Sequence, residues 1–118
     1  MRYNSVEVPT KMGTFPQYQY PHTLARYAEI GRFVGLTGKD DQEVFEKLLE
    51  KLEELKKTIE IKPTIKDYNV DEKYFLETLD EMTEQAFNDQ CTGANPRYPL
   101  MSELKEIYLK AYYGKESK

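Results

Sequence analysis

One stretch of the chain, residues 41–59, carries apolar side chains at alternating spacings of three and four residues. The residues of this stripe are Phe45, Leu48, Leu52, Leu55 and Ile59. This spacing puts them on one face of an α-helix and does not fit the two-residue period of a strand. We expect Asp40 to cap the helix and Glu43 to complete a capping box. Because the stripe lasts under three heptads, it favours an internal packing face over a coiled-coil seam.

Three further stretches have helical spacing. We expect one helix that starts after Pro21, runs to about Val34 and ends at Gly35 and Gly38, since glycine tolerates a left-handed helix end. A second runs over 72–87 behind Asp71, and a third runs over 103–113 between Ser102 and Gly114. Residues 64–68 are expected to form one short helical turn. No strand pattern of useful length occurs, so the sequence predicts an all-α helical bundle with four main helices.

Residues 1–21 differ from the rest of the chain in composition. Pro9, Pro16 and Pro21 punctuate them, and proline lacks the N–H that a helix interior or a central strand needs. Several aromatic and apolar side chains lie between these prolines. We therefore predict an irregular Pro/Tyr-rich arm over 1–21 that lies on a larger surface, and a helical segment over 22–118.

The chain has 118 residues and a formal net charge of -4. Residues 40–60 hold eight acidic and four basic side chains, so this one helix accounts for the whole excess, as one solvated face. A nucleic-acid binder would show a basic stripe, and no apolar run reaches the roughly 20 residues of a membrane span. We expect no nucleic acid and no membrane among its partners, and no signal peptide behind Met1.

The metal-binding capacity of the sequence is small. It contains one histidine, His22, and one cysteine, Cys91, which cannot by themselves supply a His/Cys zinc or iron site. We therefore expect no metal site. A lone cysteine forms no internal disulfide, which favours a reducing compartment such as the cytoplasm.

Residues 88–99 form a polar loop between two predicted helices. Gly93 and Ala94 are small enough for a close backbone approach, and Arg97 can pair with a carboxylate or a phosphate. Loops held between rigid helices often carry binding residues. From the residues alone, however, Cys91 is more often a small apolar side chain than a reactive thiol.

The sequence resembles the C-terminal end of the iron-dependent alcohol dehydrogenase half of the bifunctional aldehyde-alcohol dehydrogenases. The resemblance spans essentially the whole chain and is most specific over 87–100, followed by Ser102-Glu103-Leu104-Lys105. The shorter matching stretches are Arg2-Tyr3-Asn4, Phe15-Pro16-Gln17-Tyr18, Arg26-Tyr27-Ala28-Glu29-Ile30, Gly35-Leu36, Val70-Asp71-Glu72-Lys73, Phe75-Leu76 and Tyr112-Tyr113-Gly114.

The resemblance implies a fermentative enzyme that transfers hydride between NADH and a small aldehyde such as acetaldehyde, with Fe(2+) polarising the carbonyl oxygen. In that family one Asp and three His bind the iron, and a Gly-rich loop binds NAD. This sequence has neither group, and His22 does not lie in a ligand motif. We therefore expect the chain to bind no cofactor of its own and to be inactive outside a longer parent protein.

The resemblance also bears on the 88–99 loop. It implies that Cys91 lines the cleft on the substrate and nicotinamide side without acting as a nucleophile, and we assign no catalytic residue. Thr92, Gly93, Asn95 and Arg97 are expected to shape the loop.

Two kinds of partner follow. One is the remainder of the alcohol dehydrogenase domain, together with self-association, because helices that lose their packing partners expose apolar surface. The alternative from another class is a stand-alone helical interaction or assembly module.

Overall fold

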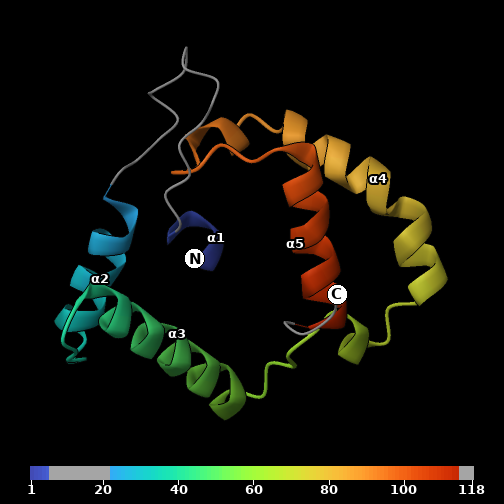
Figure 1. Cartoon of the computed structure of the whole chain (residues 1–118). Coiled ribbons are helices and arrows are strands. Elements are labelled where there is room, and N and C mark those ends of the chain that lie inside the picture. Colours follow the sequence, from blue (N-terminus) through green and yellow to red (C-terminus); the bar gives the residue numbers. More distant parts are fainter. Residues whose placement is uncertain (6–21, 115–118) are drawn as a thin grey trace. The chain divides into compact units, whose positions relative to one another are not determined.

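The computed structural model describes residues 1–5 and 22–114 and shows helices connected by turns (Figure 1). No strand occurs within these two ranges, so the predicted all-α class is confirmed for the part that is described. The elements are α1 (Arg2–Ser5), α2 (Thr23–Phe33), α3 (Asp41–Thr58), η2 (Lys66–Tyr68), α4 (Glu72–Asn88), η3 (Thr92–Ala94) and α5 (Met101–Tyr113).

The described chain divides into two compact units. Among the described residues, unit 1 comprises 1–5, 22–59 and 95–97, and unit 2 comprises 60–94 and 98–114. Of the predicted arm, residues 2–5 form a single helical turn, α1, instead of an irregular segment. The rest of that arm, residues 6–21, lies outside the described residues.

In unit 1, α2 packs closely against α3. A Cβ added at Gly31 would lie 2.7 Å from Cγ1 of Val44, so the glycine is what lets the two helices approach. Ala28, Val44 and Phe45 are fully buried between them, and the ring of Phe45 stacks on Tyr27. The core of unit 1 is thus built from small and branched side chains around one aromatic ring.

The ends of these helices follow the predicted logic with one correction. Gly35 adopts φ +91°, its N–H bonds to the Arg32 carbonyl, and the Leu36 N–H bonds to the Gly31 carbonyl, which is a Schellman motif. Asp40 caps α3 by accepting the Glu43 N–H at 2.9 Å. The predicted capping box is wrong, because the Glu43 carboxylate accepts from the N–H of Lys39, one residue further back.

In unit 2, α4 packs against α5 through aromatic rings. Phe75 and Tyr112 stack with ring centroids 4.3 Å apart, and Leu79 completes the buried cluster. The Tyr112 hydroxyl donates to the Val70 carbonyl at 2.7 Å, so this buried phenol has a partner. The aromatic contact is the centre of the unit 2 core.

Asp71 caps α4 as predicted, by accepting the Tyr74 N–H at 2.8 Å. The prediction that Ser102 caps the last helix is wrong. The N-cap position is Leu100, whose N–H donates to the Glu103 carboxylate at 2.8 Å. Glu103 can make this bond because it stands three residues behind the cap. Gly114 ends α5 with φ +103°, as its position predicts.

Only part of each predicted apolar face is buried. In α3, Phe45 and Leu48 are buried, whereas Leu55 and Ile59 are more than half exposed. In α5, the fully buried residue is Tyr112, and Ile107 is exposed. The apolar spacing therefore predicted the helices, but it did not predict how much of each apolar face another helix covers.

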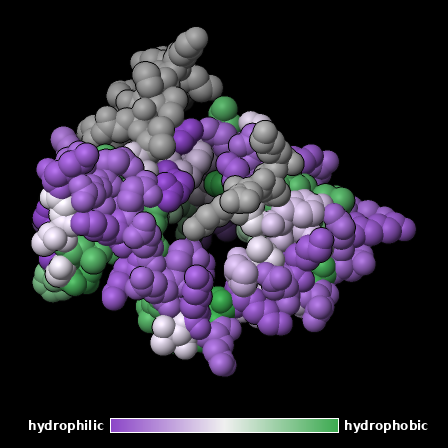
Figure 2. Space-filling view, turned by 60° about the horizontal axis from the view of Figure 1, so that its bottom comes forward, coloured by the Kyte–Doolittle hydropathy of each residue, from purple (hydrophilic) through white to green (hydrophobic). Residues whose placement is uncertain are grey.

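The surface is mostly polar, with separate apolar patches (Figure 2). Phe33, at the end of α2, is 91% exposed, and Ile30 and Val34 beside it are about half exposed. Among the described residues, no helix is both long and apolar enough to cross a membrane.

Candidate functional site

The 88–99 loop connects α4 to α5, and its first half is held by local hydrogen bonds in unit 2. The Asp89 carboxylate accepts the Cys91 N–H at 2.7 Å, and the Cys91 carbonyl accepts the Ala94 N–H at 3.0 Å. The Thr92 hydroxyl donates back to the Ala86 carbonyl in the last turns of α4. These bonds fold residues 92–94 into η3 and fix it at the end of α4.

Residues 95–97 of the loop belong to unit 1 and contact α1. The side-chain amides of Asn95 and Asn4 bond reciprocally, at 2.8 and 3.0 Å. The Arg97 guanidinium donates to the Tyr3 carbonyl at 3.1 Å and lies 3.9 Å from the centre of the Tyr3 ring. Asn95 and Arg97 thus bond to the start of the chain within unit 1, whereas Thr92 bonds to α4 within unit 2.

Cys91 lies at the turn into η3, and its side chain is exposed. A shallow depression of about 380 Å³ lies next to this turn, lined by Met82, Gln85, Ala86, Asp89, Thr92 and Tyr108. Of the predicted site residues only Thr92 is in that lining. Gly93 has open space around it, since an added Cβ would meet no atom within 4 Å. The cleft role of Cys91 therefore stays a prediction.

The contacts of Thr92, Asn95 and Arg97 support the loop-shaping role, which also stays a prediction. Sequence reasoning missed the residues that these side chains hold, Tyr3 and Asn4. Their pairing with Arg97 and Asn95 spans more than 90 positions, and a single sequence carries no signal for such a pair.

The groups with shifted pKa values lie outside this loop. A hydrogen bond to the Glu72 carboxylate raises the pKa of Tyr113, and burial raises the pKa of Tyr112. Hydrogen bonds from the Lys39 N–H and from Lys47 lower the pKa of Glu43. Each of these shifts accompanies a contact at a helix end or in a core, which marks it as structural.

The donor groups of the described residues do not fit an iron site. Over 1–5 and 22–114, no three His, Cys, Asp or Glu side chains gather closely enough to hold a metal ion. His22 is exposed at the turn that precedes α2, in unit 1, and Cys91 lies in unit 2. The one histidine and the one cysteine of the chain thus belong to different units.

The sequence of the chain matches the Fe-containing alcohol dehydrogenase family, C-terminal, over residues 3–112. The chain belongs to this family. It is 46% identical over 112 residues to an aldehyde-alcohol dehydrogenase of Clostridium acetobutylicum, a match that covers 95% of the chain. It is 48% identical over 118 residues to the bifunctional aldehyde-alcohol dehydrogenase of Escherichia coli, a match that covers 98% of the chain.

A third relative is an NADPH-dependent butanol dehydrogenase of Clostridium saccharobutylicum, 37% identical over 94 residues, or 80% of the chain and 24% of the relative. The chain spans only 13% of the length of each of the two aldehyde-alcohol dehydrogenases. It therefore corresponds to the C-terminal part of the iron-containing alcohol dehydrogenase domain, and the resemblance seen in the sequence is confirmed.

Proposed function

We propose that the chain serves as the C-terminal helical part of an alcohol dehydrogenase domain that uses iron and NAD to interconvert a small aldehyde, such as acetaldehyde, and its alcohol. The identity of 46–48% over nearly the whole chain to two aldehyde-alcohol dehydrogenases carries this proposal. Because the match spans the loop, both units and the helix ends, it supports the proposal that this chain forms the same part of such an enzyme.

Within that domain, the chain supplies helical scaffold and the loop that carries Cys91, and it supplies no iron ligand. Because the donors of residues 1–5 and 22–114 do not gather, the iron is assigned to residues of the remainder of the domain, which is the proposed partner. The nucleotide is assigned to the same remainder, since the chain lacks the Gly-rich loop. The chain by itself is then inactive. A single cysteine is in keeping with a reducing, cytoplasmic location.

A chimera tests the proposal. The segment of the Escherichia coli relative that this chain matches is replaced by residues 1–118, and NADH-dependent reduction of acetaldehyde is measured. We expect activity within about tenfold of the unaltered relative, since about half of the residues are identical. A folded chimera that binds NADH but reduces no acetaldehyde would contradict the proposal.

A matched control guards against a passive role of the segment. In it, the segment is deleted from the Escherichia coli relative and nothing is put in its place. We expect that deletion to abolish activity. Full activity of the deleted protein would mean that this part of the domain is dispensable, and the proposal would lose its basis.

Self-association of the isolated chain is part of the same proposal. Ile30, Phe33 and Val34 are exposed at spacings of three and four residues at the end of α2, so they lie on one face of the helix. Exposed apolar patches promote association. We expect sedimentation to show a dimer or larger species that Phe33→Ser weakens. A wild-type chain that stays monomeric at high concentration would rule this part out.

A further inference from the structure

The helix α1 is too short to be stable by itself. It has four residues, and none of them is buried. Because helix nucleation is unfavourable, a single turn without apolar burial forms only where other parts of the protein hold it. Besides its packing against α2, α1 makes two sets of polar contacts with other residues of unit 1.

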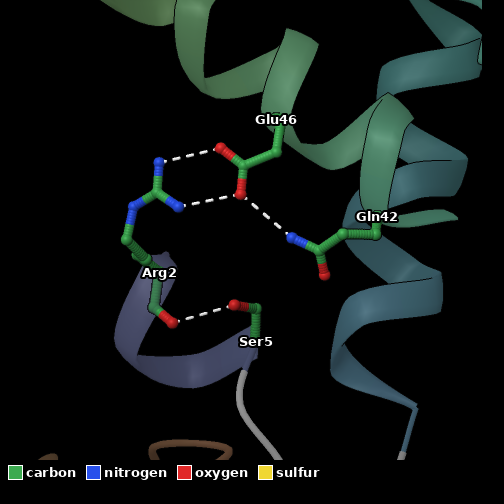
Figure 3. A network of polar contacts seen from close by, with 4 residues as sticks. All are labelled: Arg2, Ser5, Gln42 and Glu46. Atoms are coloured by element: carbon green, nitrogen blue, oxygen red, sulfur yellow. Dashed lines mark hydrogen bonds and ion pairs between the residues drawn. The ribbon is translucent and has the colours of Figure 1, made fainter.

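The first contact is an exposed ion pair with α3. The Arg2 guanidinium donates to both carboxylate oxygens of Glu46, at 2.8 and 3.0 Å, and Gln42 donates to the same carboxylate (Figure 3). The Arg2 and Glu46 side chains are 59% and 40% exposed. Exposed ion pairs contribute little to stability, so this fork does not account for the fixed position of α1.

The second set of contacts is the clasp, which we define as Tyr3, Asn4, Asn95 and Arg97. The reciprocal amide bonds between Asn4 and Asn95 are partly buried and require both amides in one orientation. Arg97 meets Tyr3 twice, through a hydrogen bond to its carbonyl and through a cation–π contact with its ring.

Asn95 links the two halves of the clasp. Besides its bonds to Asn4, its amide donates to the Arg97 carbonyl, so it fixes the backbone from which the Arg97 side chain extends. The segment 95–97 packs with unit 1 although the residues on both sides of it belong to unit 2. Because the segment 95–97 belongs to unit 1 and bonds to α1, it suits a positioning role.

We propose that Asn95 and Arg97 are positioning residues that hold α1 in one orientation and tie the start of the chain to the segment directly behind η3. The consequence for catalysis rests on the proposed function. In an alcohol dehydrogenase domain that contains this chain, the clasp fixes the orientation of α1 and thereby of the residues next to it in the domain. Neither Asn95 nor Arg97 takes part in the chemistry.

Nuclear magnetic resonance of the 118-residue chain tests the clasp directly. In the wild type, we expect the Tyr3 ring to shift the Arg97 side-chain resonances upfield, and the hydrogen bond from the Ser5 N–H to the Met1 carbonyl to slow exchange of that N–H. We expect Asn95→Ala to remove the Arg97 shift and to speed Ser5 exchange about tenfold, as the loss of one to two hydrogen bonds implies. Arg2→Ala is the matched control and should leave the Arg97 shift in place.

Two further variants separate positioning from a folding defect. Arg97→Lys keeps a cation over the Tyr3 ring and should retain slower Ser5 exchange than Arg97→Gln. The stacked Phe75 and Tyr112 rings of unit 2 report the fold and should keep their resonances in every variant. Unshifted Arg97 resonances in the wild type, or resonances that Asn95→Ala leaves unchanged, would overturn the proposal.

The catalytic consequence is measured in the chimera. We expect Asn95→Ala to lower kcat/KM about tenfold and Arg2→Ala to lower it less than about twofold, by the same comparison of bonds. A chimera that is inactive without any substitution would refute the proposed function alone, because the resonance experiment on the chain still decides the clasp. A clasp absent from the chain, with an active chimera, would refute this inference alone.

Discussion

Each unit packs two helices together, and the two units differ in the size of the side chains at the contact. In unit 1, α2 and α3 meet where Gly31 leaves room for Val44. In unit 2, α4 and α5 meet where the large rings of Phe75 and Tyr112 stack. The contact between α2 and α3 thus depends on the absence of a side chain at Gly31, whereas the contact between α4 and α5 depends on the presence of two large rings. The two should respond in opposite ways to a change in size.

The largest expected effect is in unit 2. Phe75→Ala removes a buried ring from the stack with Tyr112 and should lower the free energy of unfolding by about 3–5 kcal/mol, through lost burial and the cavity that remains. Urea unfolding followed by circular dichroism measures the loss. Leu76→Ala, at an exposed position next to it, is the control and should cost little. Equal losses in both variants would contradict the stacked core.

In unit 1 an increase in size should be harmful. Gly31→Ala puts a methyl group against Val44, and such overpacking costs about 1–3 kcal/mol. The better helix propensity of alanine offsets about 1 kcal/mol of it. Gly93→Ala, which meets no atom within 4 Å, is the matched control. In a chain that already carries Val44→Ala, Gly31→Ala should lower the free energy of unfolding by less than it does in the wild type. Equal losses in the two backgrounds would contradict the close approach.

The helix caps compare the two units on equal terms. Asp40 caps α3 and Asp71 caps α4, each by accepting one N–H at 2.9 and 2.8 Å. Each change to alanine should cost about 1 kcal/mol. Amide hydrogen exchange should place the first loss in α3 and the second in α4. Ser102→Ala should leave the free energy of unfolding nearly unchanged, because Glu103 makes the bond at the start of α5. A cost for Ser102→Ala similar to that of Asp71→Ala would refute this assignment.

The smallest effect concerns pH. Bonds from Lys39 and Lys47 lower the pKa of Glu43, so near the ordinary glutamate pKa of about 4.3 the folded chain binds fewer protons than the unfolded chain. This contribution to stability is present above that pH and is lost as the pH falls through the lowered pKa. Glu43→Gln should therefore flatten the acid side of the stability profile, which urea unfolding at a series of pH values measures. Identical acid profiles for the Glu43 variant and the wild type would count against this.

Sequence patterns located the helices because apolar period, caps and glycine stops are local. Asp40, Asp71, Gly35 and Gly114 each act within a few residues of their own position, and each lies at a helix end in the structure. The Ser102 cap was predicted wrongly because α5 begins earlier, at Met101, where the Leu100 N–H bonds to the Glu103 carboxylate.

The candidate site was harder to predict because its contacts are long-range. The loop was recognisable from its turn formers and its resemblance, and the first half is indeed closed by local bonds from Asp89 and Thr92. The pairing of Asn95 with Asn4 depends on how the chain folds back on itself, which a local pattern cannot encode. The exposure of Leu55 and Ile59 has the same origin, since burial depends on which partner covers a face.

The proposed function requires that the catalytic groups of the enzyme lie outside this chain. The most direct measurement mixes the purified chain with Fe(II), NADH and acetaldehyde and follows NADH oxidation against a blank, with the unaltered Escherichia coli relative as the positive control. We predict a rate equal to that of the blank. Oxidation of NADH that depends on the chain, on iron and on acetaldehyde would contradict the account.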